Sequence, residues 1–142
     1  MSASPIHITM VTLGVADVQA AAGFYEKLGL QRSPASQDAV VFFDMGGVAL
    51  GLYGREPLAE DAGVLPRGEG FRAVTLAWNQ PNEEAVDDAM IRAIEAGGQM
   101  IKAAKKVFWG GYSGYFSDPD GHLWEVAYNP HSPVREDGTM EL

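Results

Sequence analysis

Apolar positions along the chain follow two different spacings, one typical of strands and one typical of helices. Residues 6–15 are rich in Ile, Val, Thr and Leu, which predicts a strand. Over residues 18–28 apolar side chains recur every three or four positions, so we expect an amphipathic helix with Asp17 as its N-cap and Gly29 at its end. After this helix, short strands are predicted at residues 30–34, 39–44 and 47–53.

The second half of the chain shows the same order of patterns. A strand is predicted at 71–79, and a helix follows near 82–97, with Asn82 as its N-cap and a Gly-Gly pair after it. The remaining strands are predicted at residues 99–103, 108–117 and 122–128. Each half therefore has the order β-α-β-β-β.

Short sequence matches between the halves indicate a duplication. The triplet Val-Thr-Leu occurs at 11–13 and again at 74–76, in both cases before a predicted helix. In the same order, residues 42–47 and 116–121 share the pattern Phe-x-Asp-x-x-Gly. Repeats of this kind usually mean two equivalent modules packed together. The stretch between them, 54–70, is charged and contains Gly and Pro, so it is predicted to be a linker.

Composition then narrows the classes of function. In 142 residues, 46% are hydrophobic and the formal net charge is -9, so one folded domain is expected, with a field that repels phosphate backbones and anionic lipids. Nucleic acid and membranes are therefore not expected partners. There are no cysteines, which excludes disulfides and thiolate metal sites and favours a reducing compartment. With no membrane-spanning apolar run and no signal-peptide pattern, we expect a cytoplasmic location.

Two motifs show which proteins the chain resembles. The first is Leu-Gly-Val-Ala-Asp-Val at 13–18, followed by Phe24-Tyr25 and by Leu-Gly-Leu at 28–30. The second and more specific motif is Asp-Pro-Asp-Gly-His-Leu-Trp-Glu at 118–125. With these motifs the chain resembles the vicinal oxygen chelate superfamily, the group of glyoxalase I, bleomycin-resistance proteins and extradiol dioxygenases. The resemblance implies an α+β fold in which two βαβββ modules form a half-barrel with the ligand on its concave face.

The resemblance also carries expectations about domain limits and assembly. It implies a single domain at 5–130, with module one at 5–54 and module two at 70–130, followed by a polar C-terminal tail at 131–142 that we expect to be partly mobile. Half-barrels of this superfamily commonly complete their cavity against another chain. We therefore expect a homodimer.

Function in this superfamily usually depends on four His or Glu ligands of a metal ion. The resemblance places these ligands at Met10, Gly51, Ala73 and Glu125. Gly and Ala carry no donor atom and a thioether is a poor ligand for hard divalent ions, so we expect no metal and no other cofactor. Strand alternation is expected to turn His7 away from the face of Met10 and His122 away from the face of Glu125, and His131 falls in the tail. A metalloenzyme with unusual ligands is therefore the least favoured alternative.

Strand alternation and the resemblance together indicate which side chains line the concave face. The expected ligand-binding residues are Met10, Tyr53, Trp109, Ser113, Tyr115 and Glu125. The glycines after Trp109 either let a ligand or another backbone approach closely or mark a bulge in a core strand. Glu125 is either a functional carboxylate or a relic held by neighbouring hydrogen bonds. A cationic ligand would pair with it, and so would the lysines at 102, 105 and 106, unless these form a solvated edge.

Two functions fit these expectations. In the first, the protein binds a planar or cationic small molecule in an acidic cavity lined by Trp and Tyr, as bleomycin-resistance proteins do. In the second, it is a metal-independent enzyme of the glyoxalase and dioxygenase type, with Glu125 as general base and Tyr115 or Ser113 as proton donor or oxyanion partner. The sequence offers no second titratable group on the concave face, which favours binding over acid-base chemistry.

Overall fold

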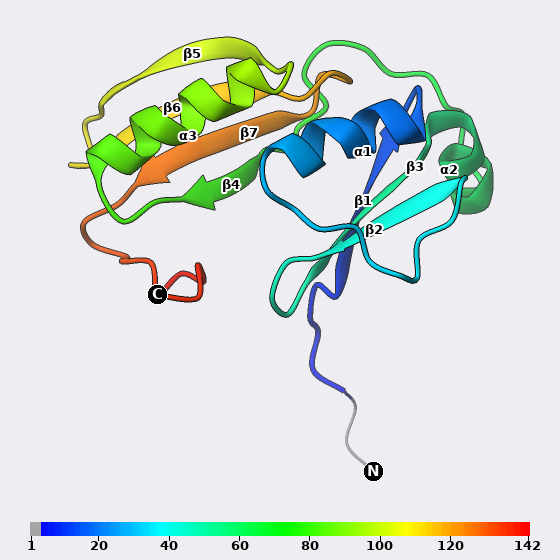
Figure 1. Cartoon of the computed structure of the whole chain (residues 1–142), viewed down its shortest axis with the longest axis horizontal. Helices are drawn as coiled ribbons and strands as arrows, with labels where there is room; N and C mark the ends of the chain where they lie inside the picture. Colours follow the sequence, from blue (N-terminus) through cyan, green and yellow to red (C-terminus); the bar gives the residue numbers. More distant parts are fainter. Residues whose placement is uncertain (1–3) are drawn as a thin grey trace.

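Two separate β-sheets, each with helices packed against it, make up the protein (Figure 1). The computed structural model describes residues 4–142. Its elements are β1 (Met10–Val15), α1 (Val18–Lys27), β2 (Val40–Asp44), β3 (Ala49–Gly54), α2 (Arg55–Ala62), β4 (Leu76–Asn79), α3 (Glu83–Glu95), β5 (Gln99–Lys106), β6 (Tyr112–Ser117) and β7 (Leu123–Tyr128). The fold is α+β, as predicted. No helix in the described part of the chain is long and apolar enough to cross a membrane.

Module one contains a three-stranded sheet in the order β1-β3-β2, with β1 and β3 parallel and β2 and β3 antiparallel. Asp17 begins α1 as predicted, because its carboxylate accepts a 3.0 Å hydrogen bond from the backbone N of Ala20. Leu13 and Val15 of β1 and Leu50 and Leu52 of β3 are buried in the core that α1 shares. The residues that alternate with them lie on the opposite face of the sheet.

Module two contains a four-stranded sheet in the order β4-β7-β6-β5, which α3 covers on one face (Figure 1). Its parallel pair, β4 with β7, corresponds to the β1–β3 pair of module one. Asn82 caps α3 through a 2.8 Å hydrogen bond from the backbone N of Ala85 to its side-chain oxygen. The repeat seen in the sequence is therefore a repeat of structure, and each sheet draws its strands from one module only.

A buried hydrogen-bond network joins the two modules. The hydroxyl of Tyr25 in α1 donates a 2.6 Å hydrogen bond to Oδ2 of Asp118, and Nε1 of Trp124 donates to the same hydroxyl at 3.1 Å. Tyr25 and Asp118 are each 1% exposed. The other oxygen of Asp118 accepts from the backbone N of Asp120 and of His122, both at 2.9 Å. The Asp-Pro-Asp-Gly turn is thus held by its own first residue and tied to helix α1.

The duplication creates two equivalent junctions between the modules, and they differ. At the first, the end of β1 meets the 118–122 turn, where Nε2 of His122 lies 2.8 Å from the carbonyl oxygen of Gly14 and the N of Ala16 donates to Asp120 at 2.8 Å. At the second, the end of β4 faces the 44–48 turn, in which Gly46 and Val48 occupy the positions of Asp120 and His122. These residues have no side chain able to form such bonds. A cavity of about 410 Å³ lies there instead, and Gly138–Met140 of the C-terminal segment line part of it.

The structure corrects two sequence-based predictions in module one and the linker. The expected strand at 30–34 is reduced to one bridge between Arg32 and Phe43. The expected linker contains a helix, α2, which packs against β1 and β3. The approach is close, because a Cβ on Gly14 of β1 would lie 3.2 Å from Cα of Arg55 in α2. Gly14 alternates with the residues buried beneath α1, so α2 covers one end of the opposite face of this sheet.

Strand limits also differ in module two. The strand expected at 71–79 begins only at Leu76, because Ala73 has a left-handed backbone with φ 63, which no strand residue adopts. The strand expected at 108–117 begins at Tyr112, after a turn in which the N of Gly110 donates to the oxygen of Val107 at 3.0 Å. The strand expected at 99–103 continues to Lys106.

Candidate functional site

Glu125 lies in the middle of the open face of the module-two sheet. In register it stands between Ala77 of β4 and Tyr115 of β6. Its neighbours Trp124 and Val126 are buried at 8% and 0% exposure, so alternation directs Glu125 to the face opposite α3. This is the orientation that the sequence analysis expected.

Tyr115 is the hydrogen-bonding group opposite Glu125. Burial raises the pKa of the Tyr115 hydroxyl, and the nearby negative charge of Glu125 raises this pKa further. The phenol therefore stays protonated at neutral pH and can donate a proton or a hydrogen bond. Ser113, two residues earlier on the same strand, is buried and stands opposite Ala127 in the register.

Trp109 lies in the turn between β5 and β6, and its ring is folded back over Gly111. A Cβ atom at position 111 would collide with the indole ring of Trp109, so no other residue fits there without moving the ring. The same turn is closed by a 3.0 Å hydrogen bond from the N of Val107 to the oxygen of Gly111, and Gly110 has φ 91. The glycine pair therefore serves a tight turn that makes room for the protein's own tryptophan.

Glu125 and Trp109 line one cavity of about 450 Å³. Its other lining residues are Ala77, Asn79, Ala127, Asn129, His131 and Met140. Strand alternation predicts Ala77 and Ala127 on this face, but the sequence analysis missed Asn79, Asn129, His131 and Met140. Asn79 could have been found, since it continues the alternation of Ala77 along β4. The other three belong to the segment after β7, where no periodic pattern indicates which way a side chain points.

Of the expected ligand-binding residues, Trp109 and Glu125 line this cavity, whereas Ser113 and Tyr115 of β6 and the module-one residues Met10 and Tyr53 do not. Tyr53 lines a different cavity, together with Pro57, Glu60 and Asp61. Met10 lies on the open face of the module-one sheet and is 44% exposed. The two halves of the expected site are therefore apart within one chain.

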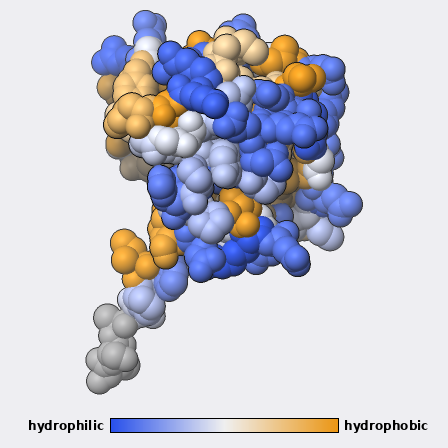
Figure 2. Space-filling view, turned by 90° about the vertical axis from the view of Figure 1, so that its left-hand side faces the viewer, coloured by the Kyte–Doolittle hydropathy of each residue, from blue (hydrophilic) through white to orange (hydrophobic). Residues whose placement is uncertain are grey.

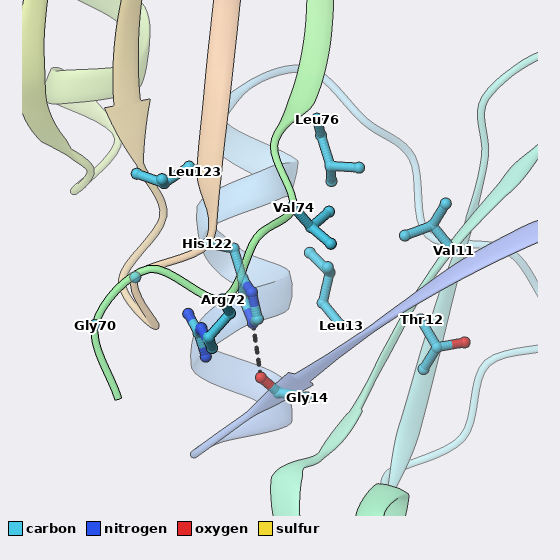
Figure 3. Close-up of a pocket in the computed structure, with 11 residues that line it drawn as sticks. Val11, Thr12, Leu13, Gly14, Gly70, Arg72, Val74, Leu76, His122 and Leu123 are labelled. Atoms are coloured by element: carbon cyan, nitrogen blue, oxygen red, sulfur yellow. Dashed lines mark hydrogen bonds between the residues drawn. The ribbon is translucent and has the colours of Figure 1, made fainter. Parts of the chain in front are cut away.

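A further cavity, of about 340 Å³, lies at the closed junction between the modules (Figure 3). Apolar side chains from β1, from β7 and from the approach to β4 surround it, and Arg72 and His122 are its charged or titratable residues. His122 is engaged with the carbonyl oxygen of Gly14, and Nη2 of Arg72 donates to the carbonyl oxygen of Asp120 at 3.3 Å. Because Arg72 and His122 already form hydrogen bonds with backbone carbonyl groups, this cavity is a less suitable ligand site than the one at Glu125.

Comparison with known proteins places the chain among its relatives. The sequence model of the Glyoxalase/Bleomycin resistance protein/Dioxygenase superfamily matches residues 7–126. The chain belongs to this superfamily. The resemblance deduced from the two motifs is thereby confirmed.

Several members of the glyoxalase superfamily are similar to the chain. A glyoxalase-related enzyme from Fulvimarina pelagi has a crystal structure with 35% identity and a TM-score of 0.87, covering 96% of this chain and 97% of that one. A lactoylglutathione lyase from Agrobacterium tumefaciens is 25% identical with a TM-score of 0.67, covering 89% of this chain and 96% of that one. The metallothiol transferase FosB of Shouchella clausii (strain KSM-K16) is 30% identical over 120 residues, which are 84% of this chain and 77% of the relative.

The residues at the metal-ligand positions of the glyoxalase superfamily do not fit a metal ion here. Met10 and Gly51 do lie side by side, since a Cβ on Gly51 would be 3.3 Å from Sδ of Met10. Neither offers an oxygen or nitrogen donor from its side chain, and Ala73 lies before β4 in left-handed backbone. Among residues 4–142 no three His, Asp or Glu side chains are grouped so that they could hold a metal. Glu125 alone cannot form a catalytic metal site.

Proposed function

We propose that this glyoxalase superfamily member binds a small planar cation, without a metal, in the cavity lined by Glu125 and Trp109. The observation that carries the proposal is the pairing of a carboxylate with an indole ring in one cavity of about 450 Å³. A cation is attracted by the carboxylate and by the face of the indole, and a planar body gains stacking area. The lack of side-chain oxygen and nitrogen donors at Met10, Gly51 and Ala73 supports a binding site without a metal.

Glu125 forms no ion pair with a cationic side chain among residues 4–142. The salt bridge found among residues 4–142 joins Nη2 of Arg32 to Oε1 of Glu26 at 2.9 Å and does not involve Glu125. Lys102, Lys105 and Lys106 are exposed on β5, an edge strand of the sheet, and form no ion pair with Glu125 within the described residues. A partly buried carboxylate without a cation is stabilised when a ligand supplies one.

A second copy of the chain completes the cavity in this proposal. Met10 at 44%, Ile8 at 73% and Ile6 at 98% exposure leave an apolar row along the first strand and the segment before it. Figure 2 shows hydrophobic surface where this N-terminal segment leaves a largely hydrophilic body. A homodimer that sets the module-one face of one protomer against the module-two face of the other brings Met10 and Tyr53 towards Glu125. Sedimentation at micromolar concentration is expected to give the mass of two chains, and a monomer alone would overturn this assembly.

The binding experiment uses benzamidine, a planar cation, and benzamide, its neutral isostere. Wild type is expected to bind benzamidine more tightly in isothermal titration, because only the amidinium pairs with Glu125. Glu125→Gln should abolish this preference and Trp109→Ala should weaken both ligands. Glu95→Gln and Phe108→Ala are the matched controls, since Glu95 is exposed at the end of α3 and Phe108 is fully exposed beside Trp109. Equal affinities in all five proteins would refute the proposed function.

Metal analysis tests the other half of the proposal. Purified protein is expected to contain well under one equivalent of Zn, Ni, Fe or Mn per chain, because three of the four ligand positions lack oxygen and nitrogen donors. One equivalent of metal in wild type that disappears in Glu125→Gln would show that Glu125 coordinates it and would overturn metal independence.

Catalysis is the alternative function, and the geometry of Tyr115 favours it. A protonated phenol opposite a carboxylate is a suitable pair for proton donation and abstraction, with Glu125 as general base. The superfamily relatives named as a lyase and a transferase give this alternative a precedent. If wild type converts a bound compound, and Glu125→Gln still binds it but no longer converts it, the protein is an enzyme rather than a binding protein. The absence of cysteines remains the basis for expecting either activity in the cytoplasm.

A further inference from the structure

The segment after β7, whose polar sequence predicts a tail, forms a hydrogen-bonded hairpin in the structure. Val134 and Met140 form an isolated bridge, and the N of Arg135 donates to the oxygen of Thr139 at 2.7 Å. The guanidinium of Arg135 also donates to the carbonyl oxygen of Met140 at 2.8 Å. The N of Glu141 donates to the oxygen of Pro133 at 2.9 Å and closes the hairpin. Figure 1 shows this hairpin turning back below the end of β4.

The hairpin and the turn before it bring three side chains to the cavity of Glu125: Asn129, His131 and Met140. The N of His131 donates to Oδ1 of Asn129 at 2.9 Å, which fixes the turn that follows β7. Nε2 of His131 lies 3.5 Å from the point where a Cβ on Gly110 would stand, so the imidazole faces the turn that carries Trp109. Met140 also lines the cavity at the open junction, so its side chain borders both cavities.

From this placement we infer that His131 is a specificity-determining residue of the Glu125 cavity, and that the ligand is a planar cation bearing a hydroxyl or similar hydrogen-bonding substituent. The imidazole forms no hydrogen bond to any residue in the described part of the chain, so its ring nitrogens are available to a ligand. A neutral imidazole has one donor and one acceptor nitrogen and can match a hydroxyl in either direction. Glu125 would take the cation, Trp109 the ring and His131 the substituent. The inference rests on the proposed function.

The test compares benzamidine with 4-hydroxybenzamidine on wild type, His131→Ala, His131→Asn and the control His7→Ala. His7 carries the same side chain, is exposed and lies outside the Glu125 cavity. Wild type is expected to bind the hydroxylated probe about fivefold more tightly, the ratio that one net hydrogen bond gives. His131→Ala should lose this ratio while keeping most of its affinity for benzamidine, and His131→Asn, which retains a donor and an acceptor, should restore part of it. His7→Ala should behave as wild type.

The outcomes separate this inference from the function on which it rests. If Glu125→Gln and Trp109→Ala weaken benzamidine while His131→Ala leaves the probe ratio unchanged, the cavity binds cations and the role of His131 is refuted. A ratio near one in wild type refutes it as well. If wild type binds neither probe, the proposed function fails and this inference fails with it. As an independent readout, the imidazole resonances of His131 should shift on titration with 4-hydroxybenzamidine, and unmoved resonances in saturated protein would overturn the contact.

Discussion

Removing one buried oxygen atom, in Tyr25→Phe, should destabilise the protein strongly. The hydroxyl of Tyr25 donates to Asp118 at 2.6 Å and accepts from Trp124 at 3.1 Å. The Asp118 carboxyl accepts three hydrogen bonds in total, the pattern of an ionised carboxylate. Phe leaves one carboxyl oxygen and one indole N–H without a partner at a site that is 1% exposed. A bond to a charged acceptor contributes about 1.5–3 kcal/mol and an unpaired buried donor costs about 1–3 kcal/mol, so we expect a loss of about 3–5 kcal/mol.

Urea denaturation, followed by circular dichroism, measures this loss. The midpoint should fall by about 2 M with an unchanged slope, given the usual slope of roughly 1–3 kcal/mol per molar urea. Tyr128→Phe is the matched control, because the hydroxyl of Tyr128 makes no hydrogen bond to the described residues and is partly exposed. If Tyr25→Phe loses no more than Tyr128→Phe, the network does not hold the modules together and the reasoning is wrong.

Further predictions concern the same fold. Burial, and then the charge of Asp118, raise the pKa of the Tyr25 hydroxyl above its ordinary 10.0, so this group ionises at a lower pH in the unfolded chain than in the folded protein. Its contribution to stability is therefore complete below pH 10 and falls above it by about 1.4 kcal/mol per pH unit. Urea titrations should show a steeper alkaline loss in wild type than in Tyr25→Phe, where Tyr115, whose pKa is also raised, still contributes. Gly111→Ala should displace the ring of Trp109, change its fluorescence and lower benzamidine affinity; an unchanged spectrum and affinity would contradict the packing. Gly98→Ala should lower the unfolding free energy by about 1–3 kcal/mol, since its Cβ would lie 2.8 Å from a backbone oxygen of β6, and a neutral effect in urea would be evidence against this contact. His122→Ala should lower the free energy of unfolding by about 1 kcal/mol in the same assay, because the carbonyl oxygen of Gly14 loses its hydrogen bond, while His7→Ala should leave it unchanged.

The sequence predicts most elements of this fold because both helices with a strong apolar stripe and most core strands carry clear periodic signals. Helix α2 has no such signal: its sequence, Arg-Glu-Pro-Leu-Ala-Glu-Asp-Ala, buries only Ala59, so composition alone suggested a linker. Ala73 shows the opposite error. The sequence pattern predicts a strand from residue 71, but the backbone at Ala73 is left-handed and the strand begins only at Leu76. Packing of α2 against β1 and β3, which the local pattern does not record, accounts for the helix.

The candidate site divides in the same way. Glu125 and Tyr115 could be placed on one face because the resemblance to the superfamily gives the inward positions of both strands, and the register sets the two residues opposite each other. His131 could not, because it lies beyond the last strand, where its position depends on the turn at Asn129 and on the hairpin bridge from Val134 to Met140. The relation of Met10 to Glu125 depends on how two sheets are set against each other. No pattern within a strand carries that information.

Because each sheet is built within one module, the connection between the modules carries no strand pairing. Every ladder pair lies either within residues 10–54 or within residues 76–128, and the chain passes between them through α2 and an irregular stretch. A chain cleaved within residues 63–75 would keep both sheets complete, and its two halves would be held together by side-chain contacts such as the Tyr25–Asp118 hydrogen bond. The protein is therefore suited to fragment complementation, in which separately expressed halves reassemble and partner choice depends on the junctions rather than on β-sheet pairing.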